Sequence, residues 1–434
     1  MFKYIIPQVL KNKDFLKLWF AQIFGQSANQ LFNFLIILKV YEMTGSNTMV
    51  SLLIVCITMP SVLFGVYAGV FADRFSQKKI MYSVNLLRAF FVFSYAFLSF
   101  HLWYIYVIAF FTSSVMQFFL PAEAARIPSV VKKEEYLSAN SLYVSTNYAA
   151  VILGYALVGF VQLMGSTEIQ FTFISVLFFI SALILLFLPP DSGNKVKVSF
   201  DKLFVGIKRD FLESWTLIKS SASIYMPFIY LVFIWVSFGV AYVVVPSLAK
   251  EILNIPIISV SHLVIIPAVF GTVMGGILVG RLCKKFKREK LINIGILLIG
   301  LDVLVVSIIP TVRSILINNG YYANLSVLII KPIIIFILMF MVGVGVILVV
   351  SISQTLLQEN IEENHRGRVF GFLYMCTNVL NFLPVIVVGI LADILTIKTV
   401  IFMLSLFVIS FSLVNFYLLH IRQLRVFKKS SLTE

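Results

Sequence analysis

Charged residues are scarce in this chain of 434 residues. Asp, Glu, Lys and Arg make up 12% of the sequence, whereas hydrophobic residues make up 60% and aromatic residues 15%. A soluble domain normally has roughly a quarter of its residues charged. The mean hydropathy of +1.00 indicates more apolar surface than one soluble core can bury. The composition therefore excludes a soluble globular protein and indicates a chain that crosses a lipid bilayer several times.

Cysteine and histidine are also scarce, with three and four residues. Cys56 and Cys376 lie inside apolar runs and Cys283 lies beside a basic loop, which indicates packing thiols and neither disulfides nor a metal site. The sequence contains no Gly-Lys-Ser/Thr phosphate loop and no His-Glu-x-x-His pattern, so neither ATP hydrolysis nor zinc proteolysis is predicted. We expect no enzyme activity, no cofactor and no metal.

Basic residues outnumber acidic ones by 34 to 19, which gives a formal net charge of +15. In a soluble protein this excess would suggest nucleic-acid binding, but here the distribution of the charges explains it. The apolar runs that could cross a bilayer cover residues 15–41, 48–72, 80–100, 103–121, 138–163, 168–188, 223–249, 259–281, 291–311, 328–353, 367–391 and 399–421. With the N-terminus in the cytoplasm, most basic residues fall in cytoplasmic tails and connections, as the positive-inside rule requires. We therefore expect a bacterial inner-membrane protein with both termini cytoplasmic, embedded in the lipid bilayer and without nucleic acid as a partner.

The longest polar connection divides these twelve runs into six and six. It predicts an N-terminal six-helix bundle over residues 1–189, a cytoplasmic linker over 190–222 and a C-terminal six-helix bundle over 223–434. Apolar residues between Phe200 and Ile218 recur at helical spacing with charges between them. This pattern indicates an amphipathic helix along the membrane surface, and a solvated linker is the alternative.

A basic turn occurs at the same place in both halves. After the second apolar run the chain reads GVFADRFSQKK over Gly69–Lys79, and after the eighth it reads GILVGRLCKK over Gly276–Lys285. The acid of the first turn, Asp73, corresponds to Gly280 in the second. Two related halves around a central pathway are a common construction of secondary transporters. The predicted fold is an all-α polytopic membrane protein with twelve transmembrane helices in two pseudo-symmetric six-helix bundles.

The first turn resembles the signature loop between the second and third spans of the major facilitator superfamily, with Ser76 in place of a usual glycine. The stretches NKDFLKLWFAQIFGQ, VYEMTGS, PAEAARIPSVVKKEEYLSANSL and ENHRGRVFG resemble its exporter branch of macrolide-efflux and siderophore-export proteins. The resemblance covers nearly the whole chain. It implies a drug:proton antiporter that exports small amphipathic organic molecules by alternating access, with protons and a small-molecule substrate as partners and the monomer as the working unit.

The resemblance also implies that the basic turn latches the two halves in the outward-open state, with Asp73 and Arg74 at its centre. The alternative is that its bases only anchor the topology. Arg88 lies within the third run, where a cation needs a partner or must reach the headgroups, and Asp73 is near enough in sequence to be that partner. The predicted latch comprises Gly69, Asp73, Arg74, Lys78, Lys79, Arg88, Gly276, Gly280 and Arg281.

The first apolar run carries a stripe of amides on one helix face. Amides at that depth do not face lipid, so they line a water-filled pathway or hydrogen-bond neighbouring helices. We favour the pathway because the stripe is continuous over three turns. A second group in the eleventh run fits the pathway and helix packing equally well. The predicted pathway residues are Gln22, Gln26, Asn29, Gln30 and Asn33 in the first run and Tyr374, Asn378 and Asn381 in the eleventh.

Proton coupling needs a titratable group within the membrane, and Asp302 in the ninth run is the predicted carrier. A buried structural acid is the alternative reading of Asp302. In the related exporters the first span commonly has an acid near Gln30, where this chain has an amide. Gly154 and Gly159 resemble the glycines of the antiporter motif and predict close helix approach, although Tyr155 stands where that motif has proline.

Three other functions remain open at this point. An uncoupled facilitator and a transporter of lipid-like substrates both fit a pathway with a single acid. A non-transporting membrane receptor or scaffold would explain the spans, but it would have little use for paired basic turns and an amide stripe.

Overall fold

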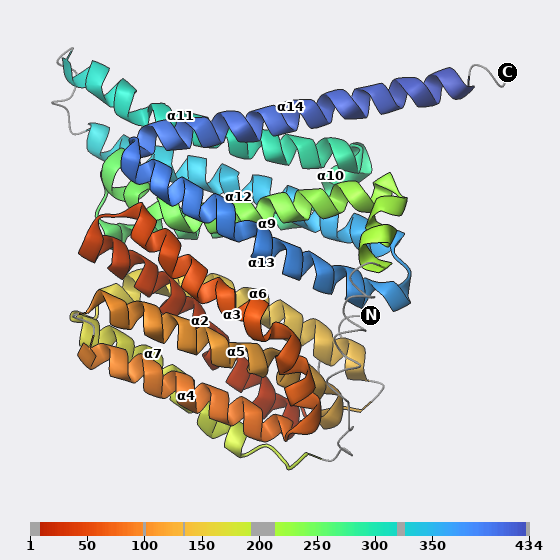
Figure 1. Cartoon of the computed structure of the whole chain (residues 1–434). Helices are drawn as coiled ribbons and strands as arrows, with labels where there is room; N and C mark the ends of the chain where they lie inside the picture. The colour runs from red at the N-terminus through yellow and green to blue at the C-terminus, as the bar shows by residue number, and fades with distance from the viewer. Residues whose placement is uncertain (1–8, 99–100, 133–134, 192–212, 319–325, 431–434) are drawn as a thin grey trace. The chain divides into compact units, whose positions relative to one another are not determined.

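The computed structural model describes residues 9–98, 101–132, 135–191, 213–318 and 326–430, and in these ranges the regular structure is helical (Figure 1). The chain divides into two compact units. Unit 1 comprises Met1–Gly45 and Met49–Asp210, and unit 2 comprises Ser46–Thr48 and Phe211–Glu434. The division falls inside the connection that the sequence predicts to separate the two halves.

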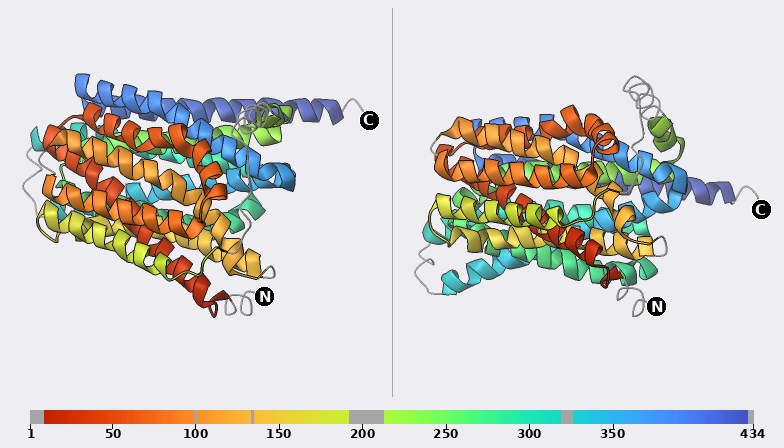
Figure 2. Two further views of the ribbon diagram at one scale, coloured as in Figure 1. Left: turned by 60° about the horizontal axis from the view of Figure 1, so that its bottom comes forward. Right: turned by 90° about the horizontal axis from the view of Figure 1, so that it is seen from below.

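Unit 1 is a bundle of long helices that run side by side, in red to yellow in Figure 1 and from two further directions in Figure 2. Helix α2 (Lys13–Thr44) is capped at its start by Asn12, whose side-chain oxygen accepts hydrogen bonds from the amides of Asp14 and Phe15, and at its end by Gly45 with a φ of 63°. Both ends therefore follow from local capping chemistry. The helices are α2 (Lys13–Thr44), α3 (Asn47–Arg74), α4 (Gln77–Leu98), α5 (Leu102–Val130), α6 (Tyr136–Gln162) and α7 (Thr167–Leu186).

Unit 2 is a second helical bundle, drawn in green to blue (Figure 1). Short helices of a different pitch, η2 (Leu248–Ile252), η3 (Ile257–Ser259) and η4 (Ser261–Ile265), join its first two long helices. The long helices are α9 (Ala222–Ser247), α10 (Ile266–Lys285), α11 (Arg288–Asn318), α12 (Ser326–Asn360), α13 (Glu363–Ile394) and α14 (Ile397–Ser430).

In the part of the chain that the structure describes, 10 helices are long and apolar enough to cross a membrane. The two long helices outside this set are α2, which carries the amide stripe, and α6. The predicted all-α membrane fold is thus confirmed. The two basic turns are equally short, since residues 75–76 join α3 to α4 and residues 286–287 join α10 to α11.

Several helices extend beyond the apolar runs that predicted them. The sequence ended the fourth span at residue 121, but α5 continues to Val130 and contains Pro121 and Pro128. The prediction was wrong there because hydropathy records where polar residues begin, whereas the helix continues while its backbone groups find partners. As a result, Glu123 and Arg126 belong to a helix and not to a connection.

Polar side chains join the helices of unit 1. Ser181 of α7 donates a hydrogen bond to the Ala21 carbonyl of α2 at 2.7 Å and accepts one from Asn85 Nδ2 of α4 at 2.8 Å. Ser175 of α7 donates to the Ala89 carbonyl of α4 at 2.8 Å. These serines and Asn85 are buried. Buried polar groups with partners hold neighbouring helices in one register.

Glycines bring the helices of unit 2 together. A Cβ atom on Gly271 of α10 would lie 1.9 Å from the Phe340 carbonyl oxygen of α12. One on Gly343 of α12 would lie 1.8 Å from the Ala268 carbonyl oxygen, and one on Gly295 of α11 would lie 2.8 Å from that of Gly345. Only glycine permits such approach of one helix backbone to another.

The segment before α9 is helical over residues 213–220 and packs on unit 2. Ile218 is fully buried in a cluster with Leu357, Val369 and Phe372, and the Trp215 ring lies 6.1 Å from the Phe372 ring. The described part of the predicted amphipathic helix therefore buries its apolar side against α12 and α13. Residues 200–212 of that prediction lie outside the described residues.

Candidate functional site

The amide stripe of α2 begins in the interior of unit 1. Gln22 and Gln26 are buried, and Gln22 Nε2 donates a hydrogen bond to the Tyr143 carbonyl oxygen of α6 at 3.1 Å. Both amides line a narrow gap that has no room for a water molecule. Asn85, Arg88, Met116 and Phe119 line its other sides. These two amides therefore contact helices of their own bundle.

The remaining amides of the stripe are half-buried. Asn29 accepts a hydrogen bond from Arg88 Nη2 through its Oδ1 atom. Gln30 lies against α6, where a Cβ atom on Gly154 would come within 2.6 Å of the Gln30 Cβ atom. Asn33 lies one turn further along the helix and is also partly accessible. The stripe thus changes along α2 from fully buried packing amides to amides that reach a surface of unit 1.

Arg88 lies in the middle of α4 and is 2% exposed. Its Nη1 atom lies 3.2 Å from the Met116 sulfur, and its guanidinium is 4.1 Å from the centre of the Phe178 ring. With Asn29, these contacts stabilise the cation through an amide dipole, a thioether and an aromatic face. The side chain of Asp73, its predicted partner, lies outside the described side chains.

The basic turn is tied to the residues that follow α7. Lys78 Nζ donates to the Leu188 carbonyl at 2.5 Å, and Lys78 N donates to Asp191 Oδ1 at 3.3 Å. Arg126 of α5 is buried and pairs with the same carboxylate oxygen at 2.8 Å while donating to the Pro189 carbonyl. Lys78 thus has a structural role within unit 1, which the sequence analysis did not predict beside the latch and the topology anchor. Arg74 is half-buried and Lys79 is exposed.

Sequence reasoning missed Glu123, which is buried on α5 with 5% exposure. Its Oε1 atom has no hydrogen-bond partner among the described residues. The Tyr143 side chain of α6 is also buried and interacts with this carboxyl group, although Tyr143 Oη makes no hydrogen bond of good geometry. The stretch PAEAARIPSVV contains the one available signal, an acid and a base three residues apart that share a helix face.

Asp302 lies within α11 and is half-buried. Its Oδ2 atom is shielded from solvent and has no hydrogen-bond partner in the described parts of the chain. Asp393 of α13 differs, because it accepts hydrogen bonds from Ser46 Oγ at 2.5 Å, from Asn47 N at 2.7 Å and from Thr48 N at 2.9 Å. Of these two acids of unit 2, Asp302 is the one with an oxygen that lacks a hydrogen-bond partner among the described residues.

The predicted polar residues of α13 differ in exposure. Tyr374 is 53% exposed and Asn378 is half-buried. Asn381 lies against α9, where a Cβ atom on Gly239 would come within 2.1 Å of its Oδ1 atom. Glycine at position 239 therefore makes room for the Asn381 amide.

The glycines of the two basic turns do not mediate close packing within their units. Among the described residues, no heavy atom comes within 4 Å of a Cβ atom placed on Gly69 or Gly280, and Gly276 would make only an ordinary contact with Ile347 at 3.7 Å. Arg281 is exposed. Of the predicted packing glycines, Gly154 lies at the close contact with α2 and Gly159 is buried.

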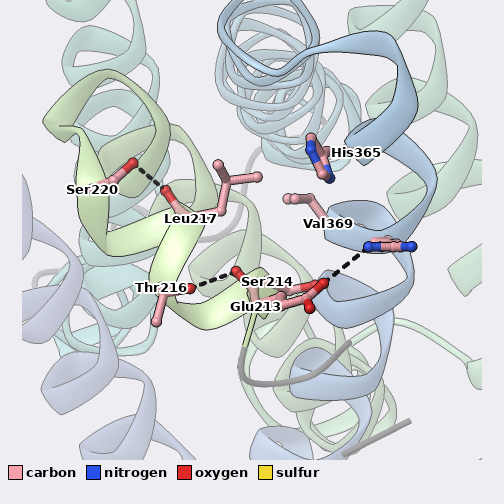
Figure 3. Close-up of a pocket in the computed structure, with 8 residues that line it drawn as sticks. Glu213, Ser214, Thr216, Leu217, Ser220, His365 and Val369 are labelled. Atoms are coloured by element: carbon pink, nitrogen blue, oxygen red, sulfur yellow. Dashed lines mark hydrogen bonds and ion pairs between the residues drawn. The ribbon is translucent and has the colours of Figure 1, made fainter. Parts of the chain in front are cut away.

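A surface pocket of about 400 Å³ lies in unit 2 between residues 213–220 and the start of α13 (Figure 3). Glu213 reaches across it to α13, where its Oε2 atom pairs with Arg368 Nη1 at 3.0 Å. His365 and Val369 face the pocket from α13. The pocket thus lies where the helix over residues 213–220 packs against α13.

Residues 9–430, outside the gaps given above, contain no group of three or more His, Cys, Asp or Glu that could hold a metal ion. Two sets of described polar residues remain as candidates for binding protons or solutes. One is the amide stripe with Arg88 and Glu123 in unit 1, and the other is Asp302 with the α13 amides in unit 2. Buried amides and isolated carboxyl groups suit proton and solute binding in a membrane interior.

Two curated relatives come from Bacillus subtilis strain 168. The MFS-type transporter YfiS is 31% identical over 155 residues, which cover 36% of this chain and 37% of YfiS. The MFS-type transporter YjbB is 27% identical over 157 residues, which cover 35% of this chain and 39% of YjbB. The matches span less than half the length of either relative, and both relatives are themselves uncharacterised.

Solved structures share the fold over most of the chain. The nucleoside transporter NupG matches with a TM-score of 0.70 and 12% identity, covering 93% of this chain and 98% of that one. The peptide transporter POT matches with a TM-score of 0.69 and 12% identity, covering 94% of each chain. The sequence pattern of the family described as Major Facilitator Superfamily matches residues 18–385. This chain therefore belongs to the Major Facilitator Superfamily of membrane transporters.

Proposed function

We propose that this protein is a secondary active transporter that exports small amphipathic organic molecules in exchange for protons. The observation that carries the proposal is Asp302, a membrane-helix carboxyl group with a shielded oxygen that has no hydrogen-bond partner. An ionised carboxylate in that position is costly, so proton binding and release change the energy of the bundle that contains it. A proton carrier of an antiporter needs this property.

The proposed substrate pathway uses the partly accessible amides. Asn29, Gln30 and Asn33 of α2 and Asn378 of α13 are half-buried and offer neutral donors and acceptors among apolar side chains. Such a lining suits organic molecules that are largely apolar and carry a few polar groups. Gln22 and Gln26 are buried packing amides, so in this proposal they support the pathway without touching the substrate.

The proposed topology places both termini and both basic turns in the cytoplasm of a bacterial inner membrane, with the monomer as the working unit. Its support is the excess of Lys and Arg in the connections on that side. Asp73 and Arg74 are the proposed centre of a cytoplasmic latch. Because Gly280 replaces the acid in the second turn, this latch is asymmetric, and the bases of unit 2 contribute charge only.

The test is transport of a fluorescent cationic dye in proteoliposomes, with and without an imposed pH gradient. The wild-type chain is expected to move the dye at least about tenfold faster with the gradient, and Asp302→Asn is expected to lose this acceleration. Glu289→Gln is the matched control, because Glu289 is an exposed acid at the start of the same helix. If the pH gradient does not change the rate of dye transport by the wild type, the protein is an uncoupled facilitator. Unchanged coupling in Asp302→Asn would remove Asp302 as the carrier.

A further inference from the structure

We propose that unit 1 contains a second proton-binding site at Glu123, with Tyr143 as the residue that stabilises its ionised form. Glu123 is 5% exposed, and its Oε1 atom has no hydrogen-bond partner in the described parts of the chain. A buried carboxylate with an unpartnered oxygen is unfavourable compared with the neutral acid. In the proposed site Glu123 therefore carries a proton.

Among the described residues, the two buried arginines of unit 1, Arg126 and Arg88, have partners other than Glu123. Arg126, on the same helix, pairs with Asp191, and Arg88 of α4 contacts Asn29, Met116 and Phe178. On the helices next to α5, Lys78 of α4 donates to the Leu188 carbonyl, Lys17 of α2 pairs with Asp14, and Lys39 of α2 donates to Thr167 Oγ1.

Tyr143 is the titratable group that faces Glu123 from α6. Its hydroxyl is buried and makes no hydrogen bond of good geometry, so it is available to donate to the carboxylate once the proton leaves. A small rotation of either side chain is enough to form that bond. Loss of the proton converts the carboxylic acid to a carboxylate, and the proton passes to water at an end of the bundle.

Glu123 is also connected to the amide stripe. The Tyr143 backbone carbonyl accepts the hydrogen bond from Gln22 Nε2, and Arg88, which donates to Asn29, lines the same narrow gap as Gln22. Ionisation of Glu123 would place a negative charge near this chain of amides and the buried guanidinium. The site is therefore positioned to couple proton release to the α2 helix, and its role in transport rests on the proposed function.

The test measures proton binding without a substrate. The full-length chain in detergent is titrated with alkali while infrared difference spectra record the carbonyl band of protonated carboxylic acids. An Asp302→Asn background removes the other membrane-helix acid that has an unpartnered oxygen among the described residues. We expect this background to retain one such band at neutral pH and to lose it when Glu123→Gln is added. A band that persists unchanged in Glu123→Gln would overturn the proposal.

Two further variants test the site in folded protein. Glu123→Asp keeps a carboxyl group, so the band should remain at a shifted frequency, and its complete absence from a folded Glu123→Asp protein would contradict the proposal. Tyr143→Phe removes the donor to the ionised form. The proton should then be held about tenfold more tightly, with half-titration at higher pH. Unchanged or weaker proton binding in Tyr143→Phe would remove Tyr143 from the site.

Dye transport gives an independent measurement. Glu123→Gln is expected to reduce the acceleration by a pH gradient about tenfold, whereas Glu289→Gln is expected to leave it unchanged. The infrared band could be lost in Glu123→Gln while a pH gradient leaves the rate of wild-type dye transport unchanged. That result would support the proton-binding site at Glu123 and contradict proton-driven export. The two proposals can therefore fail separately.

Discussion

The two units of this transporter hold their helices together by different means. Unit 1 uses buried polar side chains, including Asn85, Ser181 and the paired Arg126. Unit 2 brings helix backbones into contact through glycines such as Gly271 and Gly343. Related halves of one membrane protein can thus reach the same fold through hydrogen bonds in one half and through close packing in the other.

The difference also affects what each unit can do. A polar interior contains groups that change charge or exchange hydrogen-bond partners, and Arg88 and Glu123 are such groups in unit 1. A glycine interface has no side chain to titrate, so it is expected to act as a rigid support. In unit 2 the unpartnered acid, Asp302, lies on α11, which packs on α12 through Gly295 and Gly345.

The largest loss of stability is expected when the glycine interface of unit 2 is disrupted. Gly271→Ala places a Cβ atom 1.9 Å from the Phe340 carbonyl oxygen and should destabilise the fold by about 3 kcal/mol. Gly276→Ala, on the same helix, meets Ile347 at an ordinary 3.7 Å and should be neutral or stabilising. Thermal unfolding of the purified proteins measures both. Equal stability of the two variants would show that α10 and α12 do not need glycine contact.

The next largest loss of stability is expected when the buried ion pair of unit 1 is broken. Asp191→Asn leaves the Arg126 guanidinium, whose side chain is 1% exposed, without its counter-charge and should cost about 2 kcal/mol. Glu359→Gln is the matched change in unit 2, where the pair with Arg288 is about half exposed, and it should cost less than about 0.5 kcal/mol. Unfolding midpoints compare them, and a larger loss in Glu359→Gln would contradict the contrast between the units.

The smallest losses of stability are expected when one polar side chain is removed from each unit. Ser181→Ala removes a hydrogen bond to the Ala21 carbonyl and one from Asn85, so we expect a loss of about 1.5 kcal/mol. Ser412→Ala in unit 2 removes a single bond to the Asn293 carbonyl, and we expect about 0.5 kcal/mol. The same unfolding assay applies. Indistinguishable losses would mean that polar contacts matter equally in both units.

Much of the fold could be predicted from the sequence because a bilayer imposes strict rules. Apolar runs must be long enough to cross, and the repeated basic turn shows where the second half repeats the first. Helix ends were less predictable. Hydropathy ended the fourth span at residue 121, and α5 in fact continues to Val130.

The candidate site was predictable only in part. The spacing of Gln22, Gln26 and Asn29 predicted one helix face, but it could not separate packing amides from accessible ones. Glu123 was missed because an acid beside prolines resembles a connection when only hydropathy is considered. Its surroundings include Tyr143 of α6, and how the next helix packs on α5 cannot be read from hydropathy.

The sequence by itself determined the class of the molecule, its division into two halves and the residue types that can bind protons or polar solutes. These follow from the cost of placing charge and open backbone in hydrocarbon, which is a property of each segment alone. Only the tertiary structure decided which of these residues face each other. It turned Arg126 towards Asp191 and left Glu123 without a hydrogen-bond partner for Oε1, because partners and burial are set by neighbouring helices.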